Sequence, residues 1–462
     1  MFSIFKREQG FYRKLIALAL PIIIQNLITN SLGLVDTFMV GVLGEGPLAG
    51  VTLANVPIFV VQLMMFGVQS GSSVLISQYK GKGDMNSINR VMGLGMYSAG
   101  TITLIFALLL TFIPHQFMSL FGNDPEIIEI AAGYARIVGW SYFFDSFVQI
   151  YNGTHRAMGE PRRGMYILCV SMVVNTFLNW VLIFGNLGAP AMGVQGAAIA
   201  TLIARTLEWV MIGIHMKRTT YFKMRMKAVL LPGRRALRSC LRYATPVIAN
   251  EAFWGIGTGL YPTIMGHMEG SQEILAAYTI VGNVNTLCMV TIFGIAYTAA
   301  IMIGREIGAG NKDQVYSVGL ALDMLSVLVG VVMTAILLVF AFGIGPRFVF
   351  PVFHLSAGAA SVATVMLAIQ GAIAPIRYFN TTNIVGVLRG GGDVTMATVI
   401  DLSALWLVSL PWAAVCGLVI HTGVFWVYFA IAVEQAGKFC TGMWRLRSGK
   451  WVHDLTRNEI GE

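Results

Sequence analysis

Long runs of apolar residues, separated by short polar segments, recur along the whole chain. As a helix, each run of about 20 residues or more spans the hydrocarbon core of a bilayer. Transmembrane strands would instead be about ten residues long and alternate in polarity. The pattern therefore predicts twelve transmembrane helices, at residues 14–40, 50–78, 88–113, 127–152, 163–185, 193–216, 239–266, 274–304, 314–342, 355–387, 394–416 and 419–439.

Composition strengthens this reading. Of the 462 residues, 56% are hydrophobic and 11% are charged, and the mean hydropathy is +0.72, whereas a soluble domain has about 25% charged residues. The first apolar run follows Lys6 and Arg7, but it lacks a small-residue cleavage site and is too long for a signal peptide, so it is predicted to be the first helix. We expect an all-α integral membrane protein.

The formal charge of +9 is concentrated in alternate loops. Basic loops stay on the cytoplasmic side of a membrane, so both termini and the long middle loop are expected to be cytoplasmic. This predicts a multi-pass protein of the plasma (inner) membrane. The basic excess then favours anionic membrane lipids as partners, and no nucleic acid is expected.

The two halves of the chain resemble one another. The longest polar stretch, Met216–Arg238, lies at the centre, and a shift of about 225 residues aligns Pro21 with Pro246. A slightly larger shift aligns "GTHRAMGE" with "GVLRGGGD". The sequence predicts two six-helix lobes in a parallel internal repeat, with an N-lobe at 1–216, a cytoplasmic basic linker at 217–238, and a C-lobe with its tail at 239–462.

Ionisable residues inside the predicted spans are candidates for function, because burying a charge in a membrane is costly. Arg205 and Glu208 stand three residues apart on one helix and are predicted to form a local ion pair. Asp145 and Asp323 could each be paired structurally or line a cavity. The acidic candidates are Asp36, Asp145, Glu208, Glu251, Asp323 and Asp401, with Arg136, Arg205 and Arg377 as possible partners.

Glu251 is expected near the middle of the membrane. No cation stands three or four residues away on its own helix, where the sequence has Val247, Ile248, Trp254 and Gly255. A carboxyl in such surroundings suits ion coupling, because it can hold either a proton or a small cation. The alternative is a neutral Glu251 hydrogen-bonded to a neighbouring helix.

Asn175 and Asn179 stand four residues apart, on one face of a predicted helix. Their amide oxygens could serve Na⁺ or a hydrogen-bonded carboxyl, or the side chains could bond neighbouring helices.

The stretch "PIIIQNLITNSLGLVDTFMVGVLGEGPLAGV", "VLRGGGD", the duplication and the central basic loop together resemble the multidrug and toxic compound extrusion (MATE) family. The resemblance implies a V-shaped protein of two six-helix lobes that exports organic cations and amphipathic drugs in exchange for Na⁺ or H⁺. It implies no cofactor, no metal beyond Na⁺ at the ion site, small-molecule drug substrates and a monomer.

Residue by residue, the resemblance implies cation or proton binding in the N-lobe by Asp36, Asn175, Asn179 and Thr201. Glu251 matches an acidic residue of helix seven in one branch of the family, where it serves a C-lobe ion site.

The C-lobe pattern is incomplete, because Tyr378 stands where that branch has an acid in helix ten. Asp401 is a secondary candidate for the missing charge, and Tyr378 itself is the other secondary candidate for this site.

The sequence also bears on two functions other than multidrug export. A flippase or exporter of a lipid-linked or metabolite substrate in the same superfamily would share this fold. A membrane-embedded enzyme is not expected, because the sequence has no HExxH, no P-loop and no clustered histidines.

Overall fold

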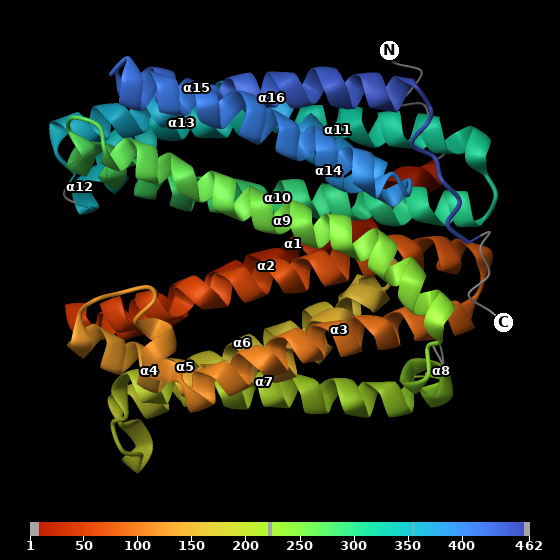
Figure 1. Ribbon diagram of the computed structural model, residues 1–462, viewed down its shortest axis with the longest axis horizontal. Coiled ribbons are helices and arrows are strands. Elements are labelled where there is room, and N and C mark those ends of the chain that lie inside the picture. Colours follow the sequence, from red (N-terminus) through yellow and green to blue (C-terminus); the bar gives the residue numbers. More distant parts are fainter. Residues whose placement is uncertain (1–8, 220–223, 354, 457–462) are drawn as a thin grey trace. The chain divides into compact units, whose positions relative to one another are not determined.

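The computed structural model describes residues 9–219, 224–353 and 355–456, and every regular element in these ranges is helical (Figure 1). The long helices are α1 (Gln9–Gly41), α2 (Glu45–Lys82), α3 (Met85–Phe112), α5 (Pro125–Ala157), α6 (Pro161–Phe184), α7 (Gly193–Arg218), α9 (Arg234–Gly266), α10 (Ser271–Gly308), α11 (Lys312–Val339), α13 (Ala357–Thr381), α14 (Val394–Ser403) and α16 (Val424–Arg447). The short helices are α4 (Pro114–Met118), α8 (Met226–Leu230), α12 (Phe350–Val352) and α15 (Leu410–Ala414).

The described residues also contain four π-helical segments and one 3₁₀ turn. The π-helical segments are η3 (Phe340–Val349), η4 (Thr382–Leu388), η5 (Ala404–Ser409) and η6 (Val415–Val419), and the 3₁₀ turn is η2 (Asn186–Gly188). The π-helical segments continue α11, α13, α14 and α15 without a break.

Each predicted span overlaps one of these helices or continuous helical runs. Among the described residues, 9 helical stretches are long and apolar enough to cross a membrane. The three remaining spans are α5, α9 and α16, which carry charged side chains within their lengths. This all-α architecture confirms the predicted fold class, and the twelve-helix count is compatible with it.

The last predicted span, 419–439, was placed too early. The helix begins at Val424 and ends at Arg447. The hydropathy pattern faded near Glu434 and Lys438, but both side chains are buried and the helix continues well beyond them. Both charges therefore lie inside the bundle instead of at its end.

Local chemistry sets several helix boundaries. The Asp84 carboxylate accepts hydrogen bonds from two backbone N–H groups at the start of α3, and Asp124 does the same for α5. These N-caps satisfy donors that have no partner within the helix. At the end of α2, Gly83 adopts a left-handed φ of 82°, which glycine reaches without steric cost.

The crossing of α11 and α13 depends on a proline and a glycine. Pro375 has no N–H, so the Gly371 carbonyl lacks its usual helical donor. The Thr334 hydroxyl donates to that carbonyl at 2.8 Å. At Gly330, an added Cβ would lie 2.6 Å from the Pro375 Cα, so the two backbones are in direct contact.

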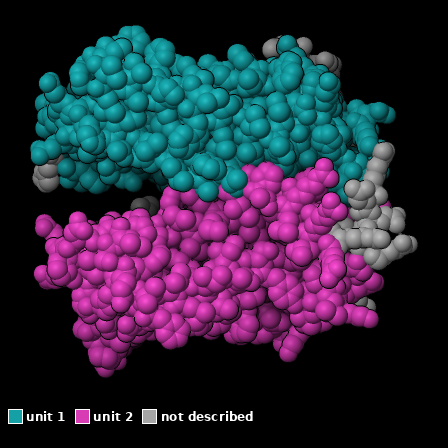
Figure 2. All heavy atoms as spheres, in the orientation of Figure 1, with its two compact units in different colours: residues 1–19, 249–457 teal, residues 20–248, 458–462 magenta. Residues whose placement is uncertain are grey.

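The chain forms two compact units, shown in Figure 2. Of the described residues, unit 1 comprises 9–19, 249–353 and 355–456, and unit 2 comprises 20–219 and 224–248. The divisions fall inside α1 and α9. The first half of α9 belongs to unit 2 because Ala244 and Ile248 pack against Gly71 and Gly67 of α2. The lobe boundaries predicted from the internal repeat stay a prediction.

Candidate functional site

Four of the predicted site residues come together in unit 2. Asp36 lies on α1, Asn175 and Asn179 on α6, and Thr201 on α7. The Nδ2 of Asn179 donates to Asp36 Oδ1 at 2.5 Å and to Asn175 Oδ1 at 3.1 Å. The Nδ2 of Asn175 donates to Thr201 Oγ1 at 3.4 Å. These residues form a chain of hydrogen bonds across three helices, which we call the Asp36 cluster.

The spacing of Asn175 and Asn179 explains the cluster. Because they are four residues apart, both amides leave the same face of α6, and both side chains are buried. The Oδ1 of Asn179 accepts no hydrogen bond from the described residues. The cluster therefore combines a carboxylate with a buried, unpaired amide oxygen, and such hard oxygen donors suit a small cation or a proton held on Asp36.

Close to this cluster lies a separate ion network on α5 and α7. The Nη1 of Arg205 contacts Glu208 Oε1 at 3.1 Å and Asp145 Oδ1 at 3.2 Å. The local pair predicted from the three-residue spacing is confirmed. The structure also resolves the question left open for Asp145, which is a structural partner of the same arginine.

In unit 1, Glu251 does have a cationic partner. The Nη1 of Arg389 donates to Glu251 Oε1 at 3.0 Å, and the arginine side chain is 1% exposed. The sequence analysis named Arg136, Arg205 and Arg377 as possible partners for the buried acids, and Arg389 was not among them. Residues 138 positions apart meet only after the chain has folded.

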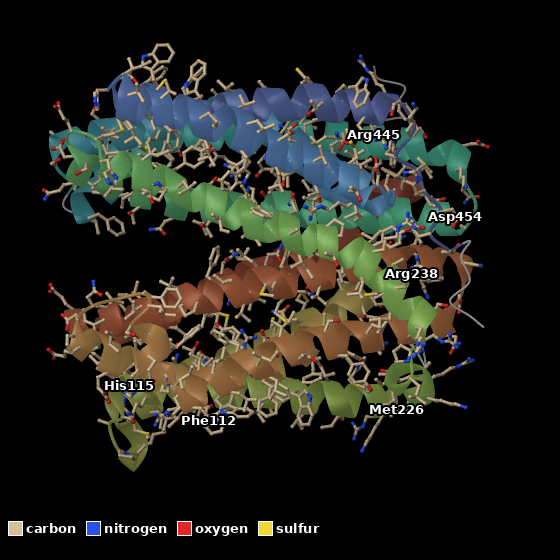
Figure 3. All side chains as sticks on the ribbon, in the orientation of Figure 1. Phe112, His115, Met226, Arg238, Arg445 and Asp454 are labelled. Atoms are coloured by element: carbon tan, nitrogen blue, oxygen red, sulfur yellow. The ribbon has the colours of Figure 1, made fainter. Side chains whose placement is uncertain are left out.

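The turn that follows Arg389 is nevertheless a structural one. The Nε of Arg445, labelled near the end of α16 in Figure 3, donates to Asp393 Oδ2 at 2.6 Å. Trp451 is buried and packs on Gly391, where an added Cβ would lie 2.3 Å from the ring. The segment after α16 is thereby fixed to the "RGGGD" turn.

A second ion network adjoins Glu251. Asn250 donates to Asp401 Oδ2 at 3.0 Å and to Glu251 Oε1 at 3.5 Å, and so links the two carboxylates. The Nζ of Lys438 contacts Asp401 Oδ1 at 2.6 Å and Glu434 Oε1 at 2.7 Å. We call these residues, together with Arg389, the unit 1 ion network. Asp401 thus lies beside Glu251. The prediction that Asp401 supplies a charge near Glu251 requires this position.

Sequence reasoning missed four members of this network: Asn250, Arg389, Glu434 and Lys438. The stretch "EQAGK" carried a signal, since Glu434 and Lys438 stand four residues apart in an apolar helix. Both stand within five residues of the predicted end of the span at residue 439, where charged side chains are expected at the membrane surface.

Tyr378 and Arg377 make their hydrogen bonds elsewhere in unit 1. The Tyr378 hydroxyl bonds the Thr291 hydroxyl at 2.6 Å and donates to the Cys288 carbonyl at 3.1 Å, both on α10. Arg377 donates to the amide oxygens of Asn285 and Gln370 at 2.6 and 2.7 Å. Arg377 was considered as a partner for a buried acid, but it is satisfied by neutral amides.

The two clusters differ in charge. In the unit 1 network, Arg389 and Lys438 already neutralise part of the carboxylate charge. Asp36 takes part in no ion pair within the described ranges. A partly buried carboxylate without an ion-pair partner among the described residues is the group with the stronger requirement for an exchangeable cation or proton.

A helical bundle of this kind, with polar and ionisable groups among long apolar helices, is typical of a multi-pass membrane protein whose intramembrane charges serve a function. The family model for MatE matches residues 21–181 and 257–415, which cover both halves and more than half of the chain. The protein belongs to the MATE family of transporters. Members of this family are transporters and not enzymes.

Several known proteins are similar over nearly the whole chain. A probable multidrug resistance protein NorM of Thermotoga maritima is 25% identical, covering 97% of this chain and 96% of the relative. Multidrug resistance protein MdtK of Yersinia enterocolitica is 24% identical over 92% of this chain and 93% of the relative. The activities in these names are those of the relatives.

Solved structures share the fold. The eukaryotic MATE transporter AtDTX14 has a TM-score of 0.84 at 18% identity and covers 97% of this chain and 98% of its own. A MOP superfamily transporter from Pyrococcus furiosus has a TM-score of 0.84 at 20% identity, covering 95% and 96%.

Proposed function

We propose that the protein is a cation-coupled multidrug antiporter that exports organic cations and amphipathic compounds across the plasma membrane. The Asp36 cluster is the observation that carries this proposal, because among the described residues its carboxylate has no ion-pair partner and the adjacent Asn179 Oδ1 accepts no hydrogen bond. The multidrug resistance proteins to which the chain is similar support the class of substrate.

In this proposal the Asp36 cluster binds the coupling ion, either Na⁺ or H⁺. Binding of the ion lowers the affinity for a cationic substrate, so each ligand shifts the protein between inward-open and outward-open states. The direction of transport then follows from the gradient of the coupling ion. No resident cofactor is required, and one chain is sufficient.

The unit 1 ion network has a second place in the proposal. Glu251 can contribute to coupling only if its carboxylate exchanges Arg389 for a proton or a cation during the cycle. Breaking a buried ion pair carries a large penalty, so we assign the main coupling role to Asp36 and treat Glu251 as a secondary coupling residue.

The test is ethidium efflux from proteoliposomes under a Na⁺ gradient and, separately, a pH gradient. We expect one of the gradients to drive efflux by the wild-type protein and Asp36→Asn to reduce that efflux at least about 10-fold. Glu251→Gln is expected to retain gradient-driven efflux at a reduced rate. Glu126→Gln, an exposed acid in the first turn of α5, is the matched control and should behave as wild type.

Two results would contradict the proposal. Undiminished gradient-driven efflux by Asp36→Asn would remove the Asp36 cluster from coupling. If neither gradient drives efflux of any drug by the wild-type protein, export of a lipid-linked or metabolite substrate becomes the better explanation.

A further inference from the structure

A further group of buried polar residues lies in unit 1, and it belongs to none of the clusters and ion networks described above. Asp323 on α11 is 0% exposed, and both of its carboxylate oxygens lack a hydrogen-bond partner within the described residues. A bare carboxylate is very costly inside a protein. The sequence analysis left Asp323 unassigned, so its environment needs an explanation.

The packing of α11 shows what Asp323 faces. An added Cβ at Gly319 would contact Val387 at 2.9 Å, and one at Gly330 would contact Pro375 at 2.6 Å. Asp323 lies between these glycines along the helix. Because residues four, seven and eleven positions apart share one face of a helix, Asp323 stands on the stripe of α11 that packs against α13 and η4.

The same contacts fix the register. Pairing Gly319 with Val387 and Gly330 with Pro375 means that α11 and the α13–η4 run are antiparallel. Asp323 is four residues, or about 6 Å, along α11 from Gly319. Moving about 6 Å from Val387 toward the start of η4 reaches Thr382 and Asn383. These two residues therefore lie at the same height in the bundle as Asp323.

Thr382 and Asn383 are themselves buried and unpaired. Both side chains are 0% exposed. The Thr382 hydroxyl and both polar atoms of the Asn383 amide make no hydrogen bond within residues 9–219, 224–353 and 355–456. Most buried polar side chains are hydrogen-bonded, so three neighbouring exceptions at one level of a bundle point to a common ligand.

The backbone at this level is also unusual. Thr382 and Asn383 open the π-helical segment η4, and π-helical turns occur frequently at functional sites. In such a turn the regular α-helical spacing of side chains changes. The Nδ2 of Asn383 faces α16, where an added Cβ at Gly442 would lie 2.9 Å from it, so the Oδ1 of the same amide is the atom available to a ligand shared with Asp323.

We propose that Asp323, Thr382 and Asn383 bind a Na⁺ ion within unit 1. The carboxylate, the hydroxyl and the amide oxygen are hard oxygen donors, which suit such a cation. A monovalent ion and one carboxylate form a neutral pair, whereas a divalent ion would leave a net buried charge. A proton on Asp323 would also neutralise the carboxylate, and the Na⁺-binding measurement below distinguishes the two.

The site stands independently of the transport proposal, and its test measures binding. Purified full-length protein is incubated with radioactive ²²Na⁺, and the bound ion is counted in wild type, Asp36→Asn, Asp323→Asn and the double variant. We expect Asp36→Asn to retain bound Na⁺ and the double variant to lose it. Asp323→Asn alone should bind one Na⁺ fewer per chain than the wild-type protein.

A second variant covers the case in which Asp323→Asn does not fold. Thr382→Val keeps the shape of the side chain and removes its oxygen, and it should weaken Na⁺ binding in the Asp36→Asn background about 10-fold or more. Ser326→Ala is the matched control, since this hydroxyl on the same stripe of α11 already donates to the Asp323 carbonyl at 2.7 Å. It should leave the binding unchanged.

Three results would overturn this site: no ²²Na⁺ bound by the wild-type protein, no ²²Na⁺ bound by Asp36→Asn, or unchanged binding by Asp323→Asn. These outcomes are distinct from a failure of the transport proposal, which is judged by efflux. Normal Na⁺ binding at Asp323 in a protein without gradient-driven efflux would reject only the antiporter assignment.

Discussion

At the scale of single residues, buried charge is matched by buried countercharge in most of the structure. Lys438 illustrates this, because its ammonium contacts Asp401 and Glu434 and its side chain is only 6% exposed. Desolvating these three groups is costly, and their mutual contacts offset that cost only while all members are present. Removing one member should therefore cost more than neutralising the whole group.

Lys438→Met is expected to destabilise the protein by about 3–5 kcal/mol, because it leaves Asp401 and Glu434 buried without their cation. The measurement is the apparent unfolding temperature of the purified protein in detergent. Lys312→Met, an exposed lysine at the start of α11, should unfold at the wild-type temperature.

The triple variant Lys438→Met, Asp401→Asn, Glu434→Gln tests the physical reason. With all three charges removed, most of the lost stability should return. If Lys438→Met is as stable as wild type, the contacts of Lys438 do not stabilise unit 1.

At the scale of elements, close packing between helices rests on glycines placed opposite a neighbouring backbone. The crossing of α11 and α13 is the clearest case, since Gly330 meets the Pro375 backbone and Thr334 satisfies the carbonyl that the proline leaves free. Small residues let membrane helices approach closely. The same crossing sets the register that places Asp323 beside η4.

Gly330→Ala is expected to lower the stability of the protein by about 1–3 kcal/mol, because the added methyl group would lie too close to a backbone that cannot rotate away. Gly282→Ala on α10 is the matched control, as an added Cβ there meets nothing within 4 Å. Apparent unfolding temperatures of the two variants should differ clearly. Equal temperatures would show that the α11–α13 crossing tolerates wider spacing.

The Gly330 substitution also bears on the proposed Na⁺ site. A wider crossing moves Asp323 away from Thr382, so Gly330→Ala should weaken ²²Na⁺ binding as well as stability. The control Gly282→Ala should affect neither.

At the scale of the whole molecule, the distribution of positive charge predicts how the chain is oriented in the membrane. Basic residues concentrate in the loops on the side of the N-terminus and around residues 217–242. Such loops are retained in the cytoplasm. Both termini are therefore predicted to be cytoplasmic, and the connection between α9 and α10 is predicted to be outside.

Reporter fusions can check this orientation. A green fluorescent protein fused after residue 232, before α9, should fluoresce, whereas alkaline phosphatase fused after Glu269, between α9 and α10, should be active. The exchanged reporters serve as controls and should be inactive. An active phosphatase after residue 232 would reverse the predicted orientation.

The sequence by itself determined the membrane class, the helical fold and the approximate position of every span, because these depend on the hydropathy of contiguous residues. It also determined the Arg205–Glu208 pair and the shared face of Asn175 and Asn179, since helical periodicity places neighbours three or four residues apart.

Only the tertiary structure decided which distant residues meet. The partner of Glu251 is Arg389, the partner of Asp401 is Lys438, and Thr382 lies level with Asp323. None of these pairs follows from local periodicity, because each joins different helices whose register is fixed by side-chain and glycine packing. Hydropathy reports that a charge is buried, whereas the crossing of the helices decides what it contacts.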